Sequence, residues 1–197
     1  MIHVNIGIAP AIDEDIEDIR AILEHGIRSK MYRGDLAWGE AATDEKQLKA
    51  IVAGGNMYVA YTEEDIVAVF MLFWDDPGRW GQQPPIAGYL HRFVVAPGLR
   101  GQNVGSQIID LICEEVAKNG RQFLRLTAPA DNEKLKAYHL KNGFTRADRK
   151  AHPSHTTEPT AFFERLISGE NQLDSAPRTK KSIAQKLRNI RIGHRYE

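Results

Sequence analysis

The sequence predicts an α/β fold built on one mixed sheet, and three observations support this prediction. Short apolar or alternating runs of strand length are interspersed with segments whose apolar residues recur every three to four positions. Two of these runs, residues 57–62 and 66–74, are separated only by an acidic turn, which predicts an antiparallel hairpin. Two further runs, residues 88–96 and 122–127, are separated by a strongly apolar helical segment, which predicts a parallel β-α-β crossover.

The predicted elements follow one another in the order βααβββαβαββ, without an internal repeat. Each strand is assigned from alternation or a continuous apolar run, and each helix from one apolar face. The predicted strands are residues 2–9, 57–62, 66–74, 88–96, 122–127, 144–149 and 160–166. The predicted helices are residues 13–28 or 13–31, the segment between Thr43 and Gly54, residues 104–119 and residues 131–141.

Local signals place the ends of these elements. Acidic residues at positions 13–15 favour a helix N-terminus, where the helix dipole stabilises negative charge. Gly120 is a natural C-terminal cap, and Asn142 with Gly143 ends the helix before it. The segments 75–85 and 150–159 are rich in polar residues and proline, which predicts loops.

Composition indicates one domain with an appendage. The 197 residues are 42% hydrophobic, and 26 basic residues balance 26 acidic ones, so the chain as a whole carries no signature of nucleic-acid or membrane binding. Cys113 is alone, which excludes a disulfide framework. We expect a cytoplasmic protein, because the sequence has neither an 18-residue apolar run nor a signal-peptide pattern.

The composition changes at Gly169. Residues 169–197 hold seven Lys or Arg against three Asp or Glu, so we predict a domain at residues 1–168 and a basic tail or short helix at residues 169–197. The tail is interpreted as a surface extension, a homodimer contact or an RNA-binding arm.

The stretch at residues 88–106 predicts an anion site. A buried strand ends at Pro97 and Gly98, a short loop with small residues follows, and a helix starts near Val104. The first N–H groups of a helix lack intrahelical partners and the dipole attracts negative charge, so phosphate is the favoured ligand. The pattern is neither a P-loop nor a GxGxxG dinucleotide turn.

The arrangement V-x-P-x-x-R-G-x-N-x-G-S in this stretch resembles the acetyl-CoA loop of the GNAT N-acetyltransferase superfamily, Q/R-x-x-G-x-G/A. Arg100 and Gly105 match that pattern. Asn103 stands where the family often has glycine, and asparagine is the side-chain-bearing residue that best tolerates a positive φ.

A second segment, residues 124–144, resembles the family pattern L-x-L-x-x-x-x-x-N-x-x-L-x-x-Y-Y-x-x-x-G-F. The matching residues are Asn132, Leu135, Tyr138, Gly143 and Phe144. Both segments occur in the family's order, and the resemblance covers residues 2–166. It implies a GNAT-like acyl-CoA N-acyltransferase fold with a basic C-terminal extension.

The resemblance also implies a set of coenzyme-binding residues. The pantetheine arm of acetyl-CoA would pair with the central strand, and the pyrophosphate would bind backbone N–H groups of the following loop. Asn132 would contact the coenzyme arm. The implied coenzyme residues are Phe93, Val94, Val95, Arg100, Gly101, Gln102, Asn103, Val104, Gly105, Ser106 and Asn132.

Two neighbouring residues compete for the role of general acid, which would protonate the departing thiolate. The family usually has a tyrosine four residues before the glycine that corresponds to Gly143, and here that position is His139. Tyr138 precedes it, and neighbours on a helix point about 100° apart. Both remain candidates, with a preference for Tyr138 because tyrosine is the family's chemistry.

His91 is the candidate general base. It lies on the central strand, on the side of Phe93 and Val95 if alternation holds, and histidine's ordinary pKa of about 6.5 suits deprotonation of an amine. No metal is expected: His152 and His155 lie in a predicted loop without a further ligand cluster.

The resemblance implies an acetyl-CoA-dependent N-acetyltransferase, which transfers an acetyl group directly from the thioester to a primary amine of a small molecule or a protein. The acceptor pocket would be built by residues 32–43, 75–85 and 150–159, with Trp80 among its walls. Two alternatives stay open. One is a non-catalytic acyl-CoA-binding sensor module, and the other is an acetyltransferase toxin that acts on aminoacyl-tRNA, favoured only by the basic tail.

Overall fold

The computed structural model describes residues 5–31, 43–99, 101–148 and 159–167. These residues form two compact units. Of the described residues, the first unit contains those up to Phe70 together with Arg92–Ile108, and the second contains Met71–His91 and those from residue 109 to residue 167. None of the helices within the described ranges combines the length and hydropathy needed to cross a membrane.

The elements confirm the predicted order, with short helical additions. The strands are β1 (Gly7–Pro10), β2 (Met57–Tyr61), β3 (Ile66–Phe73), β4 (Ala87–Val95), β5 (Phe123–Pro129), β6 (Thr145–Ala147) and β7 (Thr160–Leu166). The helices are η1 (Asp13–Asp15, a 3-10 turn), α1 (Ile16–Met31), α2 (Glu45–Ala53), α3 (Pro77–Trp80), α4 (Val104–Lys118) and α5 (Glu133–Lys141).

The seven strands form one mixed sheet in the order β1-β2-β3-β4-β5-β7-β6. β4 and β5 run parallel over Ala87 to Tyr89, which confirms the predicted crossover through α4. β7 pairs antiparallel with β5 on one side and with β6 on the other. Residues from the end of the described chain therefore lie directly beside the strand that follows α4.

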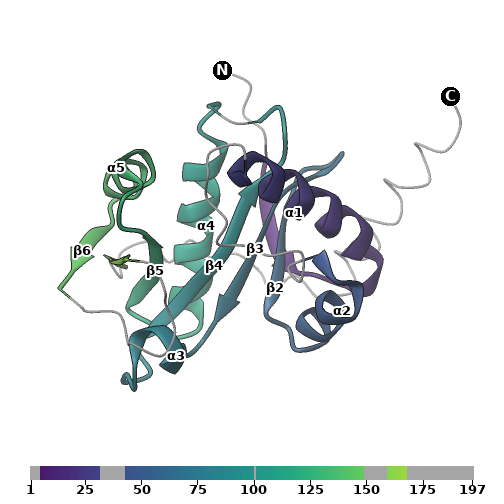
Figure 1. The fold of residues 1–197 in the computed structure, drawn as a ribbon. Coiled ribbons are helices and arrows are strands. Elements are labelled where there is room, and N and C mark those ends of the chain that lie inside the picture. Colours follow the sequence, from purple (N-terminus) through teal and green to yellow (C-terminus); the bar gives the residue numbers. More distant parts are fainter. Residues whose placement is uncertain (1–4, 32–42, 100, 149–158, 168–197) are drawn as a thin grey trace, which may run out of the picture. The chain divides into compact units, whose positions relative to one another are not determined.

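In the first unit, α1 and α2 lie side by side (Figure 1). The predicted apolar face of α1 is buried, because Ile16, Ile19, Ile22 and Leu23 are all at most 7% exposed. Asp44 caps α2 by accepting the N–H of Gln47 at 2.9 Å.

In the second unit, the apolar face of α4 is buried, because Ile109, Ile112 and Val116 are all 0% exposed. Val116 approaches β4 closely, since a Cβ added at Gly88 would lie 2.7 Å from its Cγ2 atom. Burial raises the pKa of the Cys113 thiol to about 11, which keeps it protonated at neutral pH and agrees with a packing role.

Two predictions about local structure are wrong. The segment after β3 was predicted to be a loop, but Asp76 and Pro77 start the short helix α3, because Asp is a good N-cap and Pro fits the first helical position. Trp80, predicted as a wall of the acceptor pocket, is only 2% exposed and packs against Tyr89 and Phe162. Burial of a large aromatic ring stabilises the fold, whereas exposure of the ring in a loop would give no such stabilisation.

Candidate functional site

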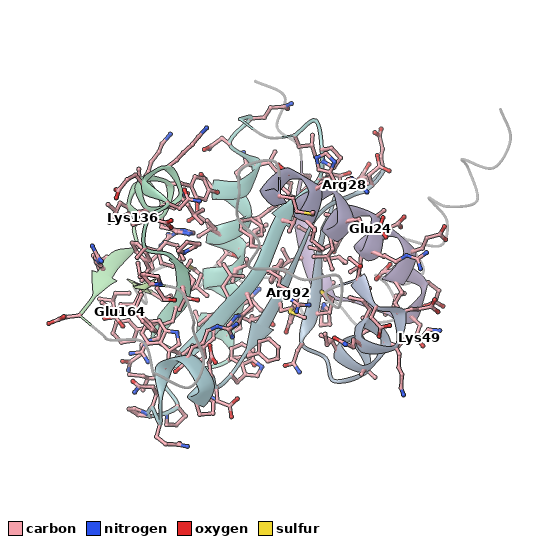
Figure 2. The ribbon with its side chains drawn as sticks, viewed as in Figure 1. Glu24, Arg28, Lys49, Arg92, Lys136 and Glu164 are labelled. Atoms are coloured by element: carbon pink, nitrogen blue, oxygen red, sulfur yellow. The ribbon has the colours of Figure 1, made fainter. Side chains whose placement is uncertain are left out.

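Strand β4 carries a break in its regular backbone at Arg92, where φ is 48°. A side-chain-bearing residue in the left-handed region within a strand marks a β-bulge, which bends the strand and interrupts the alternation of its side chains. The prediction that His91, Phe93 and Val95 share one side rested on uninterrupted alternation, and the bulge removes that argument. Arg92, labelled in Figure 2, therefore marks the point where the backbone of β4 departs from regular strand geometry.

The second part of β4 is held by side-chain packing within the first unit. Val94 is 5% exposed, and a Cβ added at Gly26 of α1 would lie only 3.0 Å from its Cγ1 atom. Phe93 meets Phe70 of β3 edge to face, with 6.3 Å between the ring centroids. The side chains thus fix the strand segment whose backbone was predicted to pair with the pantetheine arm.

The loop after β4 passes repeatedly through the left-handed region before α4 begins. Gly98 has a φ of 86°, Gly101 a φ of 84° and Asn103 a φ of 65°. An added Cβ at either glycine would meet no atom within 4 Å, so the backbone there faces open space. The positive φ at Asn103 confirms that asparagine fills a glycine-like position in this loop.

The first turn of α4 offers backbone N–H groups without a carboxylate beside them. Val104, Gly105 and Ser106 begin the helix, and the first N–H groups of an α-helix have no intrahelical acceptor. α1, α2 and α5 each carry an acidic residue in the first turn, whereas α4 carries none. A phosphate at this end would meet donors and the positive end of the dipole.

Of two other residues predicted for this loop, the structure describes Gln102 but not Arg100. The side chain of Gln102 donates its Nε2–H to the carbonyl oxygen of Gly98 at 2.8 Å, which closes the loop on itself. Arg100, which carries part of the motif, lies outside the described residues.

His91 contacts Asp76, which comes from the start of α3. His91 Nε2 lies 3.0 Å from Asp76 Oδ2, and the two side chains are only 14% and 11% exposed. Burial alone would raise the pKa of Asp76, but the hydrogen bond and charge of His91, together with Arg79, outweigh it and lower that pKa. Asp76 is therefore ionised at neutral pH, and His91 has a fixed carboxylate partner.

Asn132, predicted to contact the coenzyme arm, is the N-cap of α5. Its Oδ1 atom accepts the N–H of Leu135 at 3.0 Å. Lys136 supports the same turn by donating to the carbonyl oxygen of Ala130 at 2.7 Å. The cap occupies the amide oxygen of Asn132, so its NH₂ group is the part suited to a ligand, and the coenzyme contact stays a prediction.

Helix α5 turns its two candidate acids in different directions. His139 is 8% exposed and packs against Phe144 and Phe163, with ring centroids 5.7 and 5.4 Å away, whereas Tyr138 is half-buried. No described residue forms a hydrogen bond with the buried Nδ1 atom of His139. Burial lowers the pKa of His139 to about 4, so its imidazole is neutral at pH 7.

This lowered pKa predicts an acid-sensitive fold. Between about pH 6.5 and 4 the unfolded chain binds a proton at His139 that the folded chain excludes, so the free energy of unfolding falls by roughly 3 kcal/mol as the pH drops through this range. The measurement is urea unfolding of the wild type and of His139→Phe at several pH values. The wild type should lose stability relative to the variant, and parallel pH dependences would contradict the prediction.

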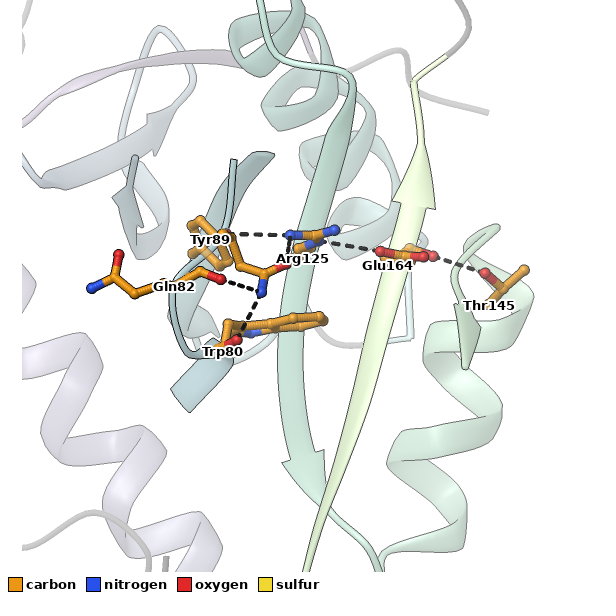
Figure 3. A network of polar contacts seen from close by, with 7 residues as sticks. Trp80, Gln82, Tyr89, Arg125, Thr145 and Glu164 are labelled. Carbon is orange, nitrogen blue, oxygen red and sulfur yellow. Dashed lines mark hydrogen bonds and ion pairs between the residues drawn. The ribbon is translucent and has the colours of Figure 1, made fainter. Parts of the chain in front are cut away.

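A buried charged network that was not predicted surrounds Arg125 (Figure 3). Arg125 donates to Glu164 at 3.1 Å, and to Gln83 and the Tyr89 hydroxyl at 3.3 Å each. Its guanidinium lies 4.9 Å from the ring centroid of Trp80. A charged residue inside the apolar strand Leu-Arg-Leu was the available signal, because a buried arginine requires a partner.

The sequence matches the family model described as "Acetyltransferase (GNAT) family" over residues 23–144. The chain belongs to this family. The match spans the bulged strand, the loop, α4 and the Gly143-Phe144 end of the second motif, so both GNAT signatures lie within it. No curated protein matches this GNAT-family sequence.

Solved structures share the GNAT fold at low sequence identity. An acetyltransferase of the GNAT family from Listeria monocytogenes is 17% identical, with a TM-score of 0.69, and the match covers 83% of this chain and 96% of that one. PaiA N-acetyltransferase from Thermoplasma acidophilum, in complex with coenzyme A, is 15% identical, with a TM-score of 0.63 and coverage of 82% and 99%. YncA from Salmonella typhimurium, with its cofactor acetyl-CoA, is 14% identical, with a TM-score of 0.61 and coverage of 87% and 99%.

Proposed function

We propose that this GNAT-family chain is an acetyl-CoA-dependent N-acetyltransferase whose acceptor is a primary amine. The observation that carries the proposal is the backbone of one continuous stretch: a bulge at Arg92, positive φ at Gly101 and Asn103, and a helix start without acids. The complexes of PaiA with coenzyme A and of YncA with acetyl-CoA support it, because both proteins share the fold.

The coenzyme would be held mainly by backbone groups. Strand residues after the bulge would pair with its amide-containing arm, and the loop with the first turn of α4 would bind its pyrophosphate. The residues we propose for this role remain Phe93, Val94, Val95, Arg100, Gly101, Gln102, Asn103, Val104, Gly105, Ser106 and Asn132.

Acetyl-CoA supplies an acetyl thioester, whose carbonyl carbon gains a bond to the amine nitrogen as its bond to sulfur breaks. The chain must supply a base, because an ammonium group has no lone pair for attack, and an acid for the departing thiolate. We assign the base to His91. We assign the acid to Tyr138, since the lowered pKa of His139 leaves that ring without the extra proton of an imidazolium at neutral pH.

The described residues leave the range of possible acceptor amines as wide as the sequence predicted. Two of the three segments predicted to line its pocket fall largely in residues 32–42 and 149–158, outside the described residues. The third forms α3, whose Trp80 is buried in the core. A small-molecule amine and a protein amine both remain acceptors to test.

Calorimetric titration with acetyl-CoA tests the binding half of the proposal, with two variants of Asn103 as a matched pair. Asn103→Gly keeps the positive φ at no steric cost and should bind as the wild type does. Asn103→Val forces a β-branched residue into the left-handed region at a cost of about 1–2 kcal/mol, so its Kd should rise about 5- to 30-fold. Equal binding by both variants would contradict the role of this loop.

The acetyl-transfer step of the proposal is tested by measuring release of free coenzyme A thiol in the presence of each of a panel of amines. Binding with amine-dependent thiol release supports the N-acetyltransferase. Binding without release from any amine would overturn the transferase in favour of the sensor module. Failure of the wild type to bind acetyl-CoA would overturn the proposal as a whole.

A further inference from the structure

Asp76 is held by two structural elements at once. Its Oδ1 atom accepts the N–H of Arg79 at 3.3 Å, which caps α3, and its Oδ2 atom lies 3.0 Å from His91 Nε2 on β4. α3 is itself anchored by Trp80, whose ring packs edge-on against Phe162 with 5.0 Å between centroids. The carboxylate therefore has one oxygen committed to a core-anchored helix and the other directed at the imidazole.

We propose that Asp76 is a positioning residue that fixes the tautomer of His91 for proton transfer from the acceptor amine. This inference rests on the proposed function, in which His91 is the base. Asp76 Oδ2 has no regularly aligned hydrogen bond among the described residues, so its 3.0 Å contact with Nε2 is an electrostatic one. Because an ionised carboxylate only accepts hydrogen bonds, this contact favours the tautomer with its hydrogen on Nε2. In a neutral imidazole the other nitrogen, Nδ1, then holds the lone pair.

The geometry sets the path of the proton. Nδ1 of His91 takes one proton from the ammonium form of the acceptor, directly or through a water molecule. The other hydrogen stays bonded to Nε2 and continues to face the Asp76 carboxylate. The imidazolium formed in this step faces the Asp76 carboxylate across 3.0 Å. The proton passes to solvent after the reaction, and the pair returns to its starting state.

Within the described part of the chain, the charged groups whose contacts are resolved near the pair act on Asp76 or on one another. Arg79 acts on Asp76, where its charge and its N–H both favour the carboxylate form. Arg125 donates to Tyr89 and to Glu164 in a network of its own. From β3 the ring of Phe73 meets His91 at 5.4 Å between centroids and brings no charge.

Asp76→Asn is the variant that isolates this role. Asparagine is as good an N-cap as aspartate, so its oxygen keeps the bond to Arg79 and its NH₂ group turns to His91. An N–H donor facing Nε2 requires a lone pair there, so the hydrogen of His91 moves to Nδ1. The matched control is Asp44→Asn, which makes the same exchange at the N-cap of α2 with no histidine partner in the described residues.

Two measurements on the full-length protein test whether Asp76 positions His91. Nitrogen-15 NMR of histidine-labelled protein reports which nitrogen of His91 is protonated, without any substrate. We expect the Nε2–H form in the wild type and in Asp44→Asn, and the Nδ1–H form in Asp76→Asn. Steady-state kinetics with the amine found by thiol release should show kcat reduced roughly 10- to 100-fold in Asp76→Asn, a changed pH profile of kcat/KM, and an unchanged Kd for acetyl-CoA.

The possible outcomes separate this inference from the proposed function. An unchanged tautomer in Asp76→Asn overturns the positioning role even if the enzyme is active. A changed tautomer with wild-type kcat and pH profile shows that the pair exists but does not serve catalysis, which also overturns it. Absence of acetyl-CoA binding by the wild type overturns the proposed function, and the role of His91 as base with it.

Discussion

Replacing His91 by glutamine is expected to lower kcat by about 100-fold or more and to leave the Kd for acetyl-CoA within about twofold of the wild-type value. Glutamine retains an N–H that can reach Asp76, so the packing at the end of α3 survives while the basic nitrogen is lost. The coenzyme affinity is expected to hold because the proposed binding groups, in the loop and the first turn of α4, are backbone groups that follow His91 in the chain.

The measurement combines thiol-release kinetics over a range of pH with calorimetry. The pH profile of kcat/KM should differ between the wild type and His91→Gln, because the variant lacks the imidazole proposed as the base. His25→Gln, in α1 and outside the proposed site, is the matched control and should behave as the wild type. A His91→Gln enzyme with wild-type turnover between pH 6 and 9 would remove His91 from the mechanism.

Replacing Glu164 by leucine is expected to lower the free energy of unfolding by about 3–5 kcal/mol. The substitution removes the only carboxylate that contacts the Arg125 side chain among the described residues. Arg125 is 8% exposed, so its charge would remain buried without a counter-charge. Urea unfolding of the wild type and the variant at one pH measures this loss.

Two further variants show whether the loss comes from the uncompensated charge. In Arg125→Met combined with Glu164→Leu no charge is left in the core, so we expect most of the stability to return. Glu45→Leu removes a carboxylate whose ion pair with Lys49 is more than half exposed, and we expect a far smaller loss of stability than in Glu164→Leu, because solvent screens the exposed pair. If the double variant is no more stable than Glu164→Leu, burial of the arginine charge is not the cause.

Elements with strong local signals were predicted well. Strand β7 was predicted with its observed bounds, and α4 begins at Val104 as expected, because apolar periodicity and flanking breakers act within a few residues. The positive φ of Asn103 was also predictable, since the resemblance placed asparagine where the family has glycine. Asp76-Pro77 is a helix-start signal that was interpreted only as the end of a strand.

The sequence by itself determined the order of the elements, the GNAT family and the position of the loop before α4 that we propose for the coenzyme, because these depend on short-range patterns. Only the tertiary structure decided which side chains meet. The Arg92 bulge ended the alternation argument for β4, the buried face of α5 distinguished His139 from Tyr138, and Asp76 reached His91 through a helix that was not predicted. Arg125 meets Glu164 across 39 positions of the chain. Contacts of this kind depend on how strands pair and helices pack, and a pattern of neighbouring residues carries no information about them.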